Sequence, residues 1–150
     1  MRINNCLSCR GFSLLELVLV MTIVGVLSSV AYPAYLDSIR ATRRVDAMNA
    51  LLTIQQMQAK YRSNHVDFGT LVDIGFRAAG ASGAVTTDGE YYTLALSEVG
   101  AVGYTITATA VKDLGQSLDK AGDTHCGTLT ITVAAQSPRG MQTPAGCWQK

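Results

Sequence analysis

The feature that most constrains this chain is an apolar stretch close to its N-terminus. Between Phe12 and Ala31 the polar side chains are limited to Ser13, Glu16, Thr22, Ser28 and Ser29. About 20 helical residues with a rise of 1.5 Å each span ~30 Å, which is enough to cross a bilayer. We therefore expect a membrane anchor here, and a folded domain has to be built from the residues that follow it.

Three details distinguish this stretch from a simple anchor. Glu16 lies four residues inside the apolar run, where a carboxylate costs up to about 2.5 to 3.5 kcal/mol at mid-bilayer and therefore needs a partner. The segment before it carries Arg2 and Arg10 and no acid, so we expect a cytoplasmic N-terminus and an outward location for the residues after Ala31. Gly11 precedes the apolar run, so cleavage there keeps the helix, whereas cleavage of a secretory signal removes it.

Gly11, Phe12 and Glu16, with a basic leader in front and an apolar helix behind, resemble the processing motif of type IV pilins. The resemblance implies that a prepilin peptidase/methyltransferase cuts between Gly11 and Phe12 and that Phe12 becomes N-methylated. It further implies that Glu16 contacts the N-terminal amine of a neighbouring subunit. A buried carboxylate paired with an ammonium costs far less than one alone, which agrees with that role.

The resemblance divides the chain into three parts. Residues 1–11 are a leader, residues 12–35 a transmembrane and filament-core helix, and residues 36–150 a head domain with a C-terminal disulfide loop. In pilins the section that corresponds to Gly25 and Pro33 is irregular inside the filament, so we assign both residues, with Glu16, to assembly. A simple kink in a continuous helix is the alternative for the isolated subunit, because Pro33 removes one backbone hydrogen bond.

The helix is expected to continue from Tyr32 to about Arg62 with an amphipathic pattern. Polar side chains such as Asp46, Asn49 and Lys60 share one face. The opposite face is apolar and consists of Ala47, Ala50, Leu51, Ile54, Met57 and Tyr61. The second half of the helix therefore has one face to bury.

Three runs with a period of two lie beyond a glycine-rich connection, in which we expect at most one short turn near residues 70–74. The runs cover residues 91–97, 104–111 and 128–133, and each has one apolar face and one polar face, rich in threonine in the last two. Such alternation is typical of an antiparallel sheet covered on one side. A fourth strand is weakly indicated, because prolines and glycines interrupt the C-terminal segment. We therefore predict an α+β fold with a long N-terminal helix on a three- to four-stranded antiparallel sheet, as in pilins.

The four cysteines fall into two groups. Cys6 and Cys9 lie in the leader without a second ligand pair at a suitable spacing, so we expect no metal or redox role for them. Cys126 and Cys147 remain in the outward, oxidising domain, where pairing is the expected outcome. This C-terminal region also resembles that of type IVa pilins of the PilE kind, major or minor.

No catalytic constellation is recognisable in the sequence. It has only two histidines, His65 and His125, and it lacks a nucleophile elbow and a phosphate-binding glycine loop. We therefore expect no enzyme, no cofactor and no metal site. Asp119 and Asp123 are too few for a calcium cage, so the expectation for them is a solvated turn.

Three functions follow as hypotheses. The first is a structural subunit, major or minor, of a type IV pilus that serves twitching motility, adhesion or DNA uptake. The second is a pseudopilin of a type II secretion system, which the terminal cysteine pair disfavours. The implied partners are other pilins in a homo- or hetero-filament, the prepilin peptidase/methyltransferase, the inner-membrane assembly platform and, before assembly, the membrane. The implied location is a single pass in the inner membrane with the head in the periplasm, and then the pilus at the cell surface.

The third hypothesis is a DNA-receptor minor pilin for natural competence, which needs a basic stripe on the head. The available basic residues are Lys112, Lys120, Arg139 and Lys150. Because Asp113, Asp119 and Asp123 lie among them, direct contact with nucleic acid is not expected. The mature chain is also close to neutral, because two of the twelve Lys and Arg residues of the full chain lie in the leader, which leaves ten basic and eleven acidic residues.

Overall fold

The computed structural model describes residues 12–76, 85–112 and 115–148 of the chain. Helix α1 runs from Leu14 to Arg62 and continues without a break through Gly25 and Pro33. The chain divides into two compact units, residues 1–36 and 37–150, and α1 contributes to both. Gly11, Cys6 and Cys9 lie outside the described residues.

The described residues of the first unit form the apolar part of α1, and their side chains are not covered by other described residues of the chain. Leu14, Met21 and Val30 are 80%, 63% and 74% exposed, and an 18-residue window of the helix contains no buried residue. By length and composition this helix is able to span a membrane. So much exposed apolar surface requires lipid or another protein around it.

The second unit, the head, contains a five-stranded antiparallel sheet in the order β1-β2-β3-β6-β7. The strands are β1 (Val85–Thr86), β2 (Tyr92–Ser97), β3 (Tyr104–Ala110), β6 (Thr128–Ala134) and β7 (Ser137–Thr143). The connection from β3 to β6 holds a short 3-10 helix η2 (Gln116–Leu118) and the small hairpin β4 (Lys120–Ala121) and β5 (Thr124–His125). A second 3-10 helix, η3 (Ala145–Trp148), follows β7.

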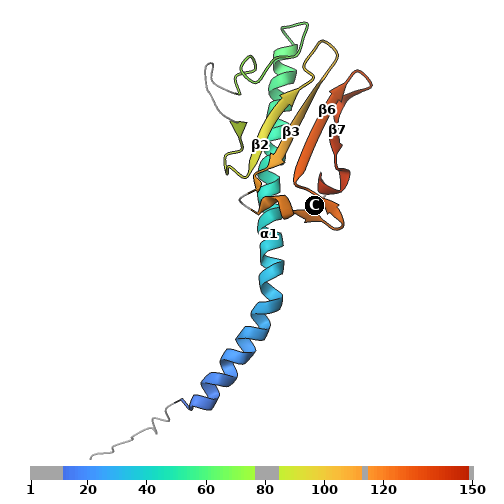
Figure 1. Cartoon of the computed structure of the whole chain (residues 1–150). Helices are drawn as coiled ribbons and strands as arrows, with labels where there is room; N and C mark the ends of the chain where they lie inside the picture. Colours follow the sequence, from blue (N-terminus) through green and yellow to red (C-terminus); the bar gives the residue numbers. More distant parts are fainter. Residues whose placement is uncertain (1–11, 77–84, 113–114, 149–150) are drawn as a thin grey trace, which may run out of the picture. The chain divides into compact units, whose positions relative to one another are not determined.

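One face of the sheet packs against the C-terminal half of α1, as Figure 1 shows. The core consists of the apolar positions of β2, β3 and β6 together with one stripe of α1, and the stripe is Ala47, Leu51 and Ile54. Each fully buried aliphatic side chain contributes about 1.5 to 3 kcal/mol relative to an exposed one. The predicted α+β fold is confirmed, and the three predicted runs correspond to β2, β3 and β6.

The sheet has more strands than the sequence indicated, because both of its edges are irregular. At one edge β1 is only two residues long. At the other edge β7 contains Pro138 and Gly140, and its pairing with β6 shifts register between Thr132 and Ala134. Edge strands tolerate proline because one side of the strand needs no ladder donor. Gly140 has φ +84°, and a Cβ there would lie 2.8 Å from Ile131 Cγ2, so this bend requires glycine.

The connection from α1 to the sheet forms one turn near its middle, where Ile74 N–H donates to the Thr70 carbonyl at 3.1 Å. The buried Gln58 side chain fixes this connection to α1. Its Nε2 donates to the Gly69 carbonyl at 2.6 Å, and its Oε1 accepts from Gly69 N–H at 3.0 Å. A single buried amide thus positions the start of the loop.

Candidate functional site

The assembly residues expected from the sequence lie on the exposed apolar helix. Phe12 is 84% exposed and precedes the first turn of α1, and Glu16 lies in that turn. No salt bridge to Glu16 forms among the residues that the structure describes. A carboxylate on an apolar helix is therefore available to a cation from outside the chain, while Gly11, on the other side of the expected scissile bond, is not among the described residues.

Gly25 and Pro33 lie within the helical span of α1. A Cβ at Gly25 would meet nothing within 4 Å, so no contact inside the chain requires glycine there. Pro33 lacks the N–H that would donate to the Ser29 carbonyl in a regular helix. The Ser29 hydroxyl, a separate group, donates to the Val26 carbonyl at 2.7 Å. The section from Gly25 to Pro33 is helical in this structure, and its helix is less stable only because glycine and proline have low helix propensity.

Cys126 and Cys147 form a disulfide with a Cα–Cα distance of 5.6 Å, and both residues are fully buried. The bond joins Cys126, which lies just before β6, to Cys147 in η3, which lies just after β7. It therefore closes the base of the β6–β7 hairpin. Constraining a loop with a sequence separation of 21 residues stabilises by about 3 kcal/mol in the chain-entropy account.

A buried polar network holds the β3–β6 connection on α1. Arg44 Nη1 donates to both carboxylate oxygens of Asp119 at 3.1 and 3.0 Å, and the two side chains are only 10% and 1% exposed. Burial raises the pKa of Asp119, and the Arg44 charge opposes that rise. Next to this pair, Gln116 Nε2 donates to the Tyr92 hydroxyl and to the Arg40 carbonyl, both at 2.9 Å.

The prediction of a solvated turn was wrong for Asp119. Only Asp123, in the turn between β4 and β5, is exposed, whereas Asp119 is paired inside the head. Among the described residues no group of three or more metal-binding side chains occurs. The sequence gives no indication of the ion pair between Arg44 and Asp119. Arg44 directly follows Arg43, and two adjacent arginines are typical of a solvent-exposed helix face.

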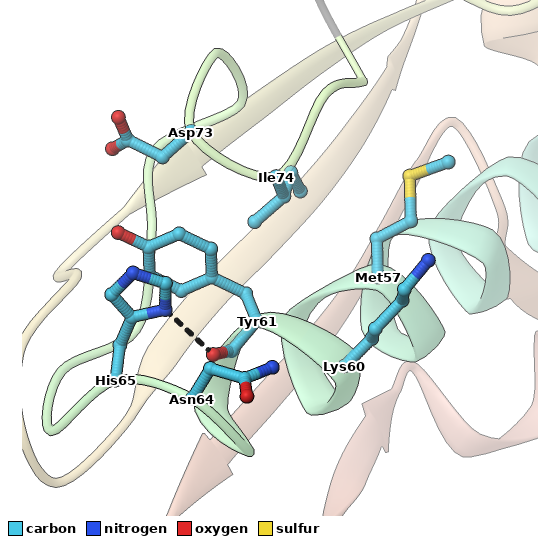
Figure 2. A pocket seen from close by; sticks show the side chains of 7 residues that line it. All are labelled: Met57, Lys60, Tyr61, Asn64, His65, Asp73 and Ile74. Carbon is cyan, nitrogen blue, oxygen red and sulfur yellow. Dashed lines mark hydrogen bonds between the residues drawn. The ribbon is translucent and has the colours of Figure 1, made fainter.

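Two of the pockets on the head surface contain a lysine side chain. Figure 2 shows the first, of about 290 Å³, between the last turns of α1 and the turn that carries Asp73 and Ile74. Its remaining walls are Met57, Lys60, Tyr61, Asn64 and His65. The Tyr61 and His65 rings stack with centroids 3.8 Å apart, and the His65 Nδ1 lies 3.0 Å from the Tyr61 carbonyl oxygen.

The second pocket, which we term the Lys112 pocket, has a volume of about 390 Å³. It lies where β3 ends and β6 begins, and its walls are Thr109, Ala110, Lys112, Ser117, His125, Gly127, Thr128 and Pro144. Lys120 is paired with His125 across the β4–β5 hairpin. Of the other basic residues considered above, Arg139 lies on the edge strand β7, and Lys150 is outside the described residues.

Comparisons with known proteins agree with these features. Residues 33–130 match the family described as type IV minor pilin ComP, DNA uptake sequence receptor, and residues 6–32 match the prokaryotic N-terminal methylation motif. Two proteins of Neisseria gonorrhoeae, each named type IV major pilin protein PilE1, are 30% and 31% identical over 102 and 100 residues. These regions cover 68% and 67% of this chain but only 55% and 56% of the relatives.

The pilin match begins within the helix at Pro33 and ends within β6 at Thr130, so it covers both the amphipathic half of α1 and most of the sheet. The chain spans about half the length of the curated relatives it matches. Because the family match covers more than half of the 150 residues, the chain belongs to the family of type IV minor pilins described as ComP, DNA uptake sequence receptor.

Proposed function

We propose that this chain is a minor subunit of a type IV pilus that binds DNA at the cell surface during its uptake. The observation that carries the proposal is the family match over residues 33–130, which joins a pilin fold to a receptor for a DNA uptake sequence. Pilins are structural proteins, so the proposal assigns the chain a binding role and no reaction. The type II secretion alternative has no comparable observation in its favour.

The assembly role rests on the unpartnered apolar part of α1. Its side chains are half to four-fifths exposed, as for Leu14, Leu17 and Val24, and each would gain about 1.5 to 3 kcal/mol on full burial. Lipid supplies that cover before assembly, and the helices of neighbouring pilins supply it afterwards. The proposed domains are accordingly a leader (1–11), a membrane and filament-core helix (12–35) and a head (36–150).

The charge chemistry of assembly centres on two residues. We assign the scissile bond to Gly11–Phe12, so that cleavage creates a new amine at Phe12, which a prepilin peptidase/methyltransferase methylates. That cation then pairs with Glu16 of an adjacent subunit, which has no salt bridge within the described chain. The pair forms on the inner-membrane assembly platform, with the head in the periplasm. The finished filament carries the head to the cell surface.

The receptor role is compatible with the acidic residues of the head, although the sequence suggests otherwise. Three aspartates near the basic residues of the head argued against direct contact with DNA. Asp119 is buried and paired with Arg44, so its charge does not face an approaching phosphate. Removing one of those acids from the surface leaves Lys112, Lys120 and His125 at the end of the sheet with a weaker opposing field.

The assembly step is tested by Glu16→Val in a strain that otherwise lacks this chain. Membrane levels are expected to stay equal or rise, because a costly charge is removed. The amount of the chain in sheared pili is expected to fall about tenfold or more, since a charge-assisted pair contributes about 1.5 to 3 kcal/mol. DNA retained by the purified pili should fall with it. The measurements are immunoblots of membranes and pili and the capture of labelled DNA by pili.

Asp67→Val provides the matched control, because it removes an exposed carboxylate from the head. Normal incorporation of Glu16→Val would refute the assembly role of the glutamate. Pili that carry the wild-type chain and retain no more DNA than pili without it would refute the receptor role, and would leave a structural subunit.

A further inference from the structure

The Lys112 pocket has the composition of a phosphate site. We propose that it binds a backbone phosphate of duplex DNA and so anchors the DNA on the head. This inference rests on the proposed receptor function, and it adds the place and the chemistry of the contact. It predicts a contact that is independent of base sequence, because phosphate oxygens position a duplex without reading it.

The donors of the pocket match a phosphodiester. Lys112 supplies an ammonium, and Ser117, Thr109 and Thr128 supply hydroxyl groups. Lysine, serine and threonine side chains are common donors to phosphate oxygens. None of the described residues that line the pocket carries a carboxylate. The pocket is therefore cationic and rich in hydrogen-bond donors.

Hydrogen bonds and the disulfide hold the segments that carry the pocket walls. Thr109 and Thr128 face each other in the β3–β6 ladder, and Ala110 N–H donates to the Gly127 carbonyl at 2.7 Å. Cys126 N–H donates to the Asp119 carbonyl at 2.9 Å, and Cys126 is fixed by the disulfide. A site on such a frame loses little conformational freedom when a ligand binds.

Close approach of two backbones gives the pocket its shape. A Cβ at Gly127 would lie 3.3 Å from the Ser117 carbonyl oxygen, so the small residue lets η2 pack against the start of β6. Ser117 is thereby brought to the same pocket as Thr128. The hydroxyl donors come from β3 and β6, which pair directly, and from η2 in the connection between them.

The surrounding charge favours an anion. Lys120 pairs with the pocket residue His125 in the β4–β5 hairpin, which brings a second lysine to the strand next to the pocket. Asp119 is turned inward to Arg44, and Asp123 is the exposed acid in the hairpin turn. The two lysines outnumber this acid among the described residues of the hairpin and pocket. A phosphate bound here would meet the Lys112 ammonium directly, and the residue paired with His125 is a second lysine.

The pocket in Figure 2 has the opposite character and supplies a matched control. Its lysine, Lys60, shares the pocket with the Asp73 carboxylate. The pocket also adjoins the C-terminal turn of α1, where the partial charge of the helix is negative. Both features disfavour a phosphate. In Figure 1 the C-terminal end of α1 and the β4–β5 hairpin (orange) lie at opposite ends of the head. The pocket with Lys60 and the pocket with Lys112 are therefore separate surfaces.

The test uses the full mature chain in neutral detergent micelles and a fluorescent DNA duplex of arbitrary sequence. Binding is measured by fluorescence anisotropy at several salt concentrations for wild type, Lys112→Gln and Lys60→Gln. Each phosphate contact contributes about 0.9 to the slope of log K against log salt. Lys112→Gln is expected to weaken binding and to reduce that slope by about 0.9, whereas Lys60→Gln leaves the slope at its wild-type value.

Different outcomes separate the site from the function. A wild-type chain that binds DNA, with an unchanged slope in Lys112→Gln, would overturn the pocket and leave the receptor function intact. A wild-type chain without DNA binding would overturn both. If Lys112→Gln reduces binding to phosphatidylglycerol vesicles but not to the duplex, the pocket belongs to lipid headgroups and the proposal fails. Thr128→Val, which removes one hydroxyl and no charge, should weaken binding with the slope unchanged.

Discussion

The two parts of α1 belong to one helix but differ in what they bury. From Leu14 to Leu36 the helix is apolar on all sides, and none of these residues is buried within the chain. From Asp37 to Arg62 apolar side chains occupy one face, and Ala47, Leu51 and Ile54 are completely buried. A helix that is apolar on one face needs one packing partner, and the sheet is that partner for the second part of α1. A helix that is apolar on all sides needs to be surrounded by lipid or by other proteins.

The second part of α1 also buries polar side chains, which the first part does not. Arg44 and Gln58 are two of the five buried residues of α1. Arg44 bonds Asp119, which lies 75 residues further along the chain, and Gln58 bonds Gly69, which lies 11 residues further along. Such bonds fix where the β3–β6 connection and the α1–sheet loop attach. Apolar packing stabilises the head, whereas these polar contacts determine which loop lies where.

The largest effect is expected from Arg44→Met, which breaks the polar anchor of the head. The Asp119 carboxylate would remain buried without its partner, and this costs about 3 to 5 kcal/mol. Urea unfolding of the full chain in micelles, followed through Trp148, measures the loss. Arg40→Met is the matched control. Its pair with Asp37 is largely exposed at the aspartate, so its loss should be below about 0.5 kcal/mol.

A double variant, Arg44→Met with Asp119→Leu, separates lost pairing from lost packing. Because no charge remains buried, the double variant should recover most of the stability lost in Arg44→Met. If the double variant is as unstable as the single one, the ion pair is not the cause of the loss.

A smaller effect is expected from a pair of identical substitutions placed in the two regions. Ile106 is fully buried in β3, whereas Ile23 on the first part of α1 is 52% exposed. Ile106→Ala should lower the free energy of unfolding of the head by about 2 to 5 kcal/mol, through lost burial and a new cavity. Ile23→Ala should leave head unfolding unchanged and reduce incorporation into pili. Equal destabilisation by both would contradict the division into two regions.

The smallest effect concerns the alkaline limit of the head. Burial raises the pKa of Tyr92 and of Tyr104 to about 12. For a group whose folded pKa is raised, the stabilisation is complete below the unfolded value of about 10 and is lost as pH rises through 12. Each tyrosine accounts for about 2 to 3 kcal/mol of that loss. Tyr104→Phe should therefore remove about half of the decline in unfolding free energy between pH 10 and 12.

Tyr32→Phe, on the first part of α1, is the control for that measurement, since its side chain is 64% exposed and lies outside the head core. Its unfolding curve should follow the wild type at every pH. An alkaline decline that is unaltered by Tyr104→Phe would mean that buried phenols do not set the limit.

The sequence by itself determined the elements whose periodicity is strong. The apolar run from Phe12, the amphipathic face with Leu51 and Ile54, and the alternation in β3 and β6 are patterns of local spacing, and local spacing is sufficient to predict them. Where periodicity is interrupted, prediction became weaker. Pro138 and Gly140 made β7 difficult to predict from the sequence. The segment forms a strand because it lies at the edge of the sheet, where proline is tolerated, and because a register shift accommodates both residues.

Only the tertiary structure decided which polar residues face inward. Arg44 and Asp119 are 75 residues apart, and no spacing rule relates a cation on a helix to a carboxylate in a distant loop. The same holds for the Lys112 pocket, since Ser117, His125 and Thr128 meet only after β3 pairs with β6 and η2 packs on Gly127. Local propensity acts over a few residues, whereas burial and pairing of charge depend on what the folded chain brings within a few ångströms.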